Sequence, residues 1–259
     1  MSRAISPHPS SAWLHLVRDI GRKWHFVRFA ALLMAAATAP SAYHRGVSRA
    51  VAQAVCFAAG QALPGYALLS VLVAAVTTHI VAVSAASYGL SHLALEALVR
   101  VFVVELVPLT AALFVAMRSG IAVLDHLAAL RARRQRLESG AAFLQVVLPG
   151  FIGNLFATLL LTLASSLLSL MTAYLVVHGL TSSGIAGFSR LIGQVFDPVT
   201  LPGFLLKTGL FGLAVGIAPT TVVLDAPRRA AAGSEMRVMA RLFLSLVLIE
   251  GASLIVLHL

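Results

Sequence analysis

The chain has 259 residues, of which 59% are hydrophobic and 11% are charged, and its formal net charge is +10. Soluble domains carry about a quarter charged residues, so this composition excludes an ordinary soluble globular protein. Several apolar stretches also exceed the length of about 20 residues that a helix needs to cross a bilayer. We therefore predict an all-α, polytopic membrane protein. The single cysteine, Cys56, excludes an intramolecular disulfide.

The N-terminal segment, residues 1–45, has the pattern of an interfacial amphipathic helix. Charged residues separate its apolar positions, which recur at helical spacing at Trp13, Leu14, Leu16, Val17, Ile20, Trp24 and Val27. Tryptophan favours the depth of the lipid headgroups, and cations favour acidic lipid. The segment lacks the apolar core and cleavage site of a signal peptide. A weaker amphipathic stretch over residues 43–60 follows, so we expect residues 1–60 to form a cytoplasmic, interfacial helical region.

Five apolar segments then predict five transmembrane helices within one domain, residues 61–259. The expected spans are residues 63–88, 93–117, 143–177, 201–224 and 238–259. The third span is longer than one crossing requires, and Pro149–Gly150 interrupts it, so we expect its first part to be an interfacial or broken helix. Residues 178–200 form a Gly/Ser/Thr-rich connection. A short amphipathic helix is expected there at Phe188, Leu191, Ile192 and Val195.

The distribution of basic residues predicts the topology. Seven Lys/Arg residues precede the first span, five lie in residues 118–136 and four lie in residues 228–241, so sixteen of the nineteen share one side. Basic loops face the cytoplasm, which places the N-terminus in the cytoplasm and the C-terminus outside. Because the positive charge follows the topology, we expect no nucleic-acid partner.

The sequence contains no catalytic or metal-binding arrangement of residues. Gly203 and the Lys207–Thr208 pair do not form a phosphate-binding Gly-x4-Gly-Lys-Ser/Thr loop, and they lie inside an apolar span. The nine histidines show no paired spacing of metal ligands. We expect no cofactor and no metal. A membrane enzyme that acts on lipids has no support, because neither paired acids nor a nucleophile with its base is found.

Four ionisable residues lie within the expected spans in positions that need partners, and they are the candidate functional residues: Arg100, Glu105, Lys207 and Glu250. A charge at the bilayer centre costs about 2.5 to 3.5 kcal/mol, so such residues face protein or water rather than lipid. We therefore expect Glu105, Lys207 and Glu250 to form a buried network that either holds the spans in register or contacts a lipid headgroup. Arg100 lies four residues after Glu96, a spacing that places both side chains on one face of a helix.

Two stretches of the apolar spans contain specific motifs. Residues 105–120 read Glu-Leu-Val-Pro-Leu-Thr-Ala-Ala-Leu-Phe-Val-Ala-Met-Arg-Ser-Gly. This run resembles the signature of the MlaE/YrbE permease family, Arg-Glu-Leu-Gly-Pro-(x)3-Ala-Leu-x-x-Ala-Gly-Arg-x-Gly. Residues 206–212, Leu-Lys-Thr-Gly-Leu-Phe-Gly, are similar to the start of the family's fourth span. The expected interfacial helix, five spans and short C-terminus also match the family.

The resemblance implies a lipid transporter. Family members are homodimeric permeases of ATP-binding-cassette (ABC) transporters in the bacterial inner membrane, and each works with a cytoplasmic ATPase and a periplasmic lipid-binding protein of the MCE type. Bacterial members move phospholipids between the inner and outer membranes. The resemblance therefore implies membrane lipid as the ligand, with Glu105, Lys207, Glu250 and Tyr88 as ligand-binding residues. Tyr88 would lie at the periplasmic mouth of a lipid cavity, or would be an ordinary interfacial tyrosine.

The sequence departs from the family pattern at three places. Val104 replaces the arginine before the glutamate, and Arg100, one turn upstream, is the candidate to supply the lost cation. Val107 replaces the glycine before the proline. The loop that holds the ATPase-coupling helix in the family is basic here and several residues shorter. The resemblance implies coupling by Arg118, Arg131, Arg134 and Glu138, although the arginines also serve topology. The alternative function is a non-transporting paralogue that acts as a membrane scaffold.

Overall fold

The structure is a computed structural model that describes residue 35 and residues 45–89, 91–118, 140–181, 184–225 and 234–258. The chain divides into two compact units, Met1–His44 and Arg45–Leu259, and the account below concerns the second. The expected interfacial helix around Trp13–Val27 lies outside the described residues, so it remains a prediction. The boundary expected at residue 60 is also still a prediction.

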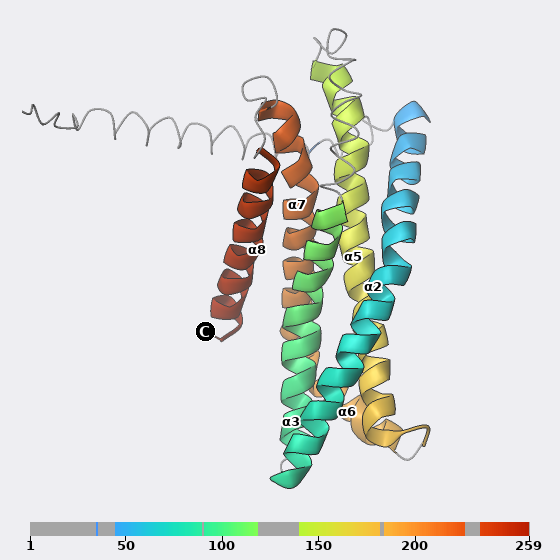
Figure 1. Cartoon of the computed structure of the whole chain (residues 1–259), viewed down its shortest axis with the longest axis vertical. Coiled ribbons are helices and arrows are strands. Elements are labelled where there is room, and N and C mark those ends of the chain that lie inside the picture. Colours follow the sequence, from blue (N-terminus) through green and yellow to red (C-terminus); the bar gives the residue numbers. More distant parts are fainter. Residues whose placement is uncertain are drawn as a thin grey trace, which may run out of the picture. The chain divides into compact units, whose positions relative to one another are not determined.

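Every regular element of the described residues is a helix, which confirms the all-α prediction (Figure 1). The elements are α2 (Arg45–Ser87), α3 (Ser91–Val99), the π-helix η2 (Arg100–Leu106), α5 (Gly140–His178), α6 (Ile185–Val195), α7 (Thr200–Asp225) and α8 (Ser234–His258). Residues 107–118 continue η2 as an α-helix.

Four helical segments within the described residues are long and apolar enough to cross a membrane. They are Ser48–Ser87, Leu93–Arg118, Leu148–His178 and Thr200–Ile217. Their outward faces carry large apolar side chains such as Leu68, Leu72 and Leu167, as expected for contact with lipid. A membrane protein with several spans is therefore confirmed. The fifth expected span corresponds to α8 and remains a prediction.

Two proline-containing segments are more continuous than their sequence indicates. α5 runs unbroken through Pro149, so the expected interruption at Pro149–Gly150 is wrong. Similarly, α2 is a single helix of 43 residues that contains Pro64, so the amphipathic stretch expected over residues 43–60 continues directly into the first span. Close packing explains the continuity of α5, because a Cβ at Gly153 would lie 3.1 Å from the carbonyl oxygen of Ala54 in α2. Packing of this kind offsets the loss of one helical hydrogen bond at a proline.

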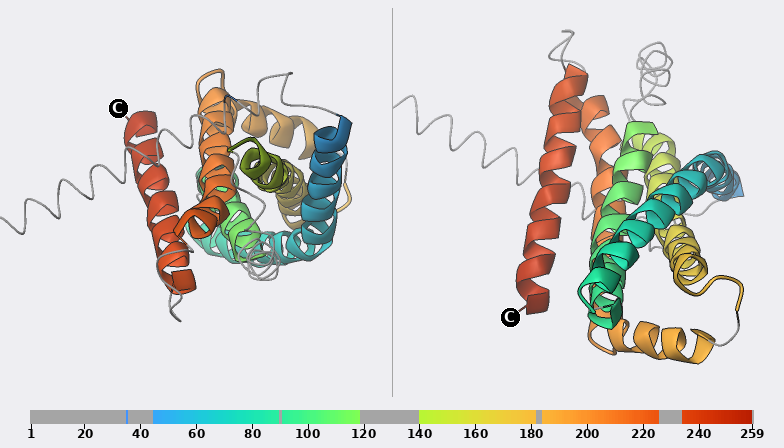
Figure 2. Two further views of the ribbon diagram at one scale, coloured as in Figure 1. Left: turned by 90° about the horizontal axis from the view of Figure 1, so that it is seen from above. Right: turned by 60° about the horizontal axis from the view of Figure 1, so that its bottom comes forward.

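α5 packs between α2 and α7, and α8 packs on α7 (Figure 2). One core cluster joins α2, α5, α7, α8 and the 107–118 helix through buried side chains that include Tyr66, Ala112, Leu161, Phe211 and Leu246. A second cluster joins α3, η2, α6 and the start of α7. These two clusters hold η2 against α7 and so position the residues of the site.

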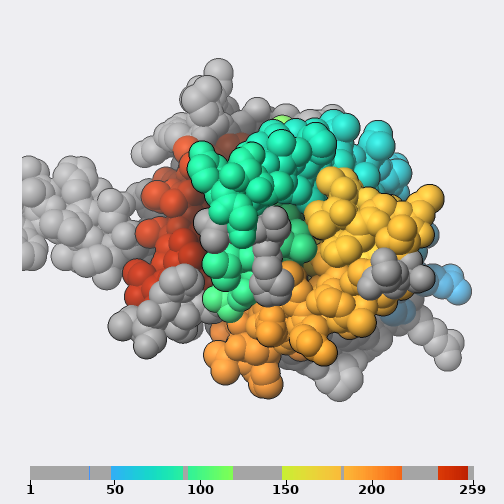
Figure 3. All heavy atoms as spheres, turned by 90° about the horizontal axis from the view of Figure 1, so that it is seen from below, coloured from blue at the N-terminus to red at the C-terminus, as the bar shows by residue number. Residues whose placement is uncertain are grey.

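The short amphipathic helix expected in residues 178–200 is confirmed as α6. Its buried side chains are Phe188, Leu191 and Val195. The helix lies across the end of the long helices where α2 meets α3 (Figure 2). Seen from this end, α2, α3, α6 and the end of α5 form one continuous face (Figure 3).

Candidate functional site

A widened helical turn carries Glu105. In η2 the backbone N–H of Val107 donates to the carbonyl oxygen of Phe102, five residues back, instead of to the residue four back. Pro108 follows directly, and its ring would clash with the carbonyl group four residues before it in an α-helix. The π-helical turn therefore accommodates the proline. Such turns are frequent at functional sites, because they change the direction of the side chains that they carry.

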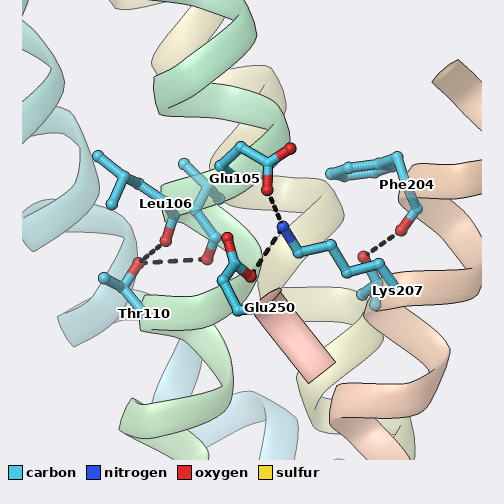
Figure 4. A network of polar contacts seen from close by, with 8 residues as sticks. Glu105, Leu106, Thr110, Phe204, Lys207 and Glu250 are labelled. Carbon is cyan, nitrogen blue, oxygen red and sulfur yellow. Dashed lines mark hydrogen bonds and ion pairs between the residues drawn. The ribbon is translucent and has the colours of Figure 1, made fainter. Parts of the chain in front are cut away.

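Three side chains from three helices meet beside this turn (Figure 4). The ammonium group of Lys207, in α7, donates a hydrogen bond to Oε2 of Glu105 in η2. The same nitrogen lies 2.8 Å from Oε2 of Glu250 in α8. Lys207 is only 3% exposed. The structure thus brings together the three residues for which the sequence predicts a network.

The network contains more negative than positive groups. Lys207 is shared by two carboxyl groups, so the cluster has a net charge of −1 when all three residues are ionised. The ring of Phe211 also lies near the ammonium, with its centroid 5.8 Å from Nζ. Removing one partner of a buried ion pair destabilises a protein by about 3–5 kcal/mol, because the other charge is left unpaired. The network therefore binds η2, α7 and α8 strongly to one another.

Tyr66 supports the turn from the opposite side, a role that the sequence analysis missed. Its hydroxyl donates to the carbonyl oxygen of Val107 at 3.1 Å and lies 2.7 Å from the hydroxyl oxygen of Thr110. Thr110 in turn donates to the carbonyl oxygen of Leu106 at 2.8 Å. These bonds fix the two residues that follow Glu105. The signal in the sequence is a tyrosine in the middle of an apolar helix, where its hydroxyl needs a partner.

The remaining candidate residues lie away from the network. Tyr88 is 79% exposed, in the turn after α2. Arg100 is exposed, and among the described residues no ion pair joins it to Glu96, four residues earlier. Arg118 donates to the side-chain oxygen of Gln61 and, at 3.3 Å, to its carbonyl oxygen. Three further candidates lie outside the described residues: Arg131, Arg134 and Glu138.

Asp197 forms the N-cap of α7. Its Oδ1 accepts the backbone N–H groups of Thr200 at 2.6 Å and of Val199 at 3.1 Å. The hydrogen bond from Thr200 is the largest cause that holds the pKa of the Asp197 carboxyl below its usual value. The hydrogen bond from Val199 and the nearby charge of Arg100 lower this pKa further. Pro198 stands at the first helical position, where its missing N–H is harmless. The cap fixes the start of the helix that carries Lys207.

The sequence model "Permease MlaE" matches residues 51–256. The chain belongs to the MlaE permease family. It is a membrane permease subunit of an ABC-type transporter rather than an enzyme, and this class of subunit works with an ATPase partner. No curated protein and no solved structure shows significant similarity to the chain. In this MlaE-family permease the matched range contains all of η2, α5 and α7, and with them Glu105, Lys207 and Glu250.

Proposed function

We propose that this MlaE-family permease moves phospholipid between the bacterial inner membrane and a periplasmic carrier of the MCE type. A separate cytoplasmic ATPase supplies the energy, since the sequence contains no nucleotide-binding motif. Two copies of the chain form the working unit. The N-terminus is cytoplasmic and the C-terminus periplasmic, as the basic loops indicate.

The observation that carries the proposal is the position of Lys207 between Glu105 and Glu250. A helix that only anchors a protein in lipid needs no such network, because ionisable residues inside a membrane are expensive and are usually functional. A phospholipid headgroup contains a phosphate that pairs with an ammonium group. Many headgroups also contain an amine that pairs with a carboxylate. The network offers partners for both groups.

Two further sets of residues have proposed roles at the two ends of the spans. Tyr88 lies at the periplasmic mouth of the lipid path, which agrees with its high exposure in the turn after α2. Arg118, Arg131, Arg134 and Glu138 form the coupling region for the ATPase. The contact of Arg118 with Gln61 would pass a movement of this region to α2.

The test is purification of the full chain in mild detergent, with mass spectrometry of the associated proteins and lipids. We expect an ATPase of the ABC type, an MCE-domain protein and bound phospholipid. Lys207→Ala should lose the lipid but keep the ATPase. Arg190→Ala is the matched control, because it removes an exposed cation of α6 outside the network. Recovery of neither ATPase nor lipid with the unmodified chain would favour the scaffold function.

A further inference from the structure

α5 carries a row of buried hydroxyl side chains that the proposed transport function does not use. They are Thr158, Thr162, Ser165, Ser166 and Ser169, and each is at most 6% exposed. With 3.6 residues per turn, positions spaced by three and four residues lie on one face of a helix. The hydroxyl groups therefore line one side of α5 for about three turns, inside the bundle.

Three of these hydroxyl groups have no hydrogen-bond partner among the described residues: those of Thr162, Ser166 and Ser169. A hydroxyl in a helix usually donates to a carbonyl group three or four residues back. Thr158 does so to Asn154 at 2.9 Å, and Thr172 does so to Leu168 at 2.7 Å. A buried hydroxyl without a partner is unfavourable, and buried polar groups in native proteins are nearly always paired with protein or water.

Helix packing alone does not explain the three residues. Small side chains allow membrane helices to approach closely, and alanine does this as well as serine. The same bundle uses alanine at other fully buried positions, such as Ala111, Ala112 and Ala157. Serine or threonine at a dry position would add an unpaired polar group with no gain in packing. The hydroxyl groups therefore indicate a polar ligand.

The register of α5 and α7 places these hydroxyl groups at the level of the ion network. A Cβ at Gly212 would lie 2.7 Å from Leu155, and a Cβ at Gly216 would lie 2.8 Å from Phe151, so the two helices are antiparallel and in close contact. Both helices rise about 1.5 Å per residue, so Lys207 is level with residue 160. Its long side chain leans toward the N-terminus of α7, which is the level of Thr162 and Ser166.

η2 and α2 give the same level independently. Leu170, the residue after Ser169, packs against the cluster that contains Phe102, Val103 and Val104 of η2. In Figure 4 α5 passes behind the network, between η2 and α7. On α2, Tyr66 lies twelve residues after Ala54 and donates to Val107 at the end of η2, and Ser165 lies twelve residues after Gly153, the contact of Ala54 on α5.

We propose that Thr162, Ser166 and Ser169 bind a short row of water molecules inside the bundle, which hydrates the network of Lys207, Glu105 and Glu250. A buried water makes about three hydrogen bonds, which this region supplies. The ammonium group has three N–H donors, of which one donates to Glu105; Oε2 of Glu250 lies 2.8 Å from the nitrogen as an ion pair but accepts no hydrogen bond from the described residues. Water accepts from the remaining donors and donates to Oε2 of Glu250, which also stabilises the surplus negative charge. This site does not depend on which substrate the permease carries.

Hydroxyl-radical footprinting by X-ray pulses tests the proposal on the full chain in nanodiscs. A bound water yields a radical that oxidises the nearest side chain, even one that bulk solvent does not reach. We expect oxidation of Leu161 and Phe211, which are both fully buried. Phe151, equally buried at the opposite end of the α5–α7 contact, is the dry control. Oxidation of Leu161 and Phe211 no greater than that of Phe151 would overturn the proposal.

Isosteric variants supply a second readout. Thr162→Val with Ser166→Ala and Ser169→Ala should reduce oxidation at Leu161 to the level at Phe151. Thr158→Val is the matched control, because this hydroxyl is paired with its own helix, and it should leave the footprint unchanged. If the triple variant does not fold, the thermal midpoint of the single variant Thr162→Val tests whether the site holds water. The midpoint falls if the hydroxyl binds water, and it rises if the site is dry because an unpaired group is removed.

Discussion

Nζ of Lys207 lies 2.8 Å from Oε2 of Glu250, so an ion pair inside the bundle joins α8 to α7. α8 has few other described contacts that are polar, and its buried apolar contacts, Leu242 and Leu246, lie one to two turns earlier. Ile249, beside Glu250, also packs against the core, so the ion pair and this apolar contact together hold the middle of α8. Because Lys207 also binds Glu105, any change at this lysine affects three helices together.

Lys207→Met should destabilise the permease more than Glu250→Gln does. The methionine leaves two buried carboxyl groups without their cation, which we expect to lower stability by about 3–5 kcal/mol. Glu250→Gln keeps the pair of Lys207 and Glu105 intact. The thermal midpoint of the purified protein in detergent measures both effects. A triple variant, Glu105→Gln with Lys207→Met and Glu250→Gln, should recover part of the lost stability. Equal midpoints for Lys207→Met and Glu250→Gln would contradict the shared role of the lysine.

Gly216→Ala should disrupt the contact of α5 with α7, whereas Gly209→Ala should not. A Cβ at Gly216 would lie 3.0 Å from the carbonyl oxygen of Phe151 and 2.8 Å from its ring, so the helices must separate. Nothing lies within 4 Å of a Cβ at Gly209, in the same helix. Alanine there is expected to be neutral or to stabilise the helix by up to about 1 kcal/mol. Thermal midpoints of the two variants measure the difference, and a loss for Gly209→Ala as large as that for Gly216→Ala would show that the contact is not specific.

The sequence predicted the members of the ion network because charges within apolar helices need partners. Glu105, Lys207 and Glu250 lie more than forty residues apart along the chain, yet each is too costly to expose to lipid. The sequence did not predict the backbone geometry that positions Glu105 or the contacts that support it. The π-helical turn depends on a balance between Pro108 and the packing of Phe102 to Val104, which no periodicity reveals. Tyr66 was missed because its partner is a backbone carbonyl group.

Proline gave one error of the sequence analysis. Pro149 was expected to interrupt the third span, yet α5 continues through it as one helix. Pro64 likewise lies inside the single helix α2. A proline removes one hydrogen bond, a local loss that can be recognised from sequence. The gain that offsets it comes from helix contacts such as that of Gly153 with Ala54, which only the tertiary structure contains.

Pro108→Ala should convert η2 to a regular α-helix. Alanine supplies the missing N–H and removes the clash with the preceding carbonyl group, so the widened turn is no longer favoured. A π-helical turn contains about one residue more than an α-helical turn. When the turn becomes α-helical, the two parts of the helix rotate relative to each other by about 100°, which would carry Glu105 away from Lys207. Cryo-electron microscopy of the variant would show both changes. Pro64→Ala, in α2, is the control that should leave η2 as it is. A π-helical turn that persists in Pro108→Ala would mean that packing rather than the proline maintains it.

Asp197 should make the start of α7 sensitive to acid. The lowered pKa of this carboxyl means that the folded state favours the ionised form. The resulting stabilisation is complete above the usual pKa of aspartate, and it is lost as the pH falls through the lower pKa of the folded state. Hydrogen exchange of residues 199–203 measures the cap directly, and protection should decrease as the solution is acidified into that range. Asp197→Asn keeps a capping oxygen without a titrating group, so its protection should not depend on pH in this range. Asp197→Ala should be unprotected at every pH. A wild-type profile that matched Asp197→Asn throughout would exclude ionisation of Asp197 as the cause.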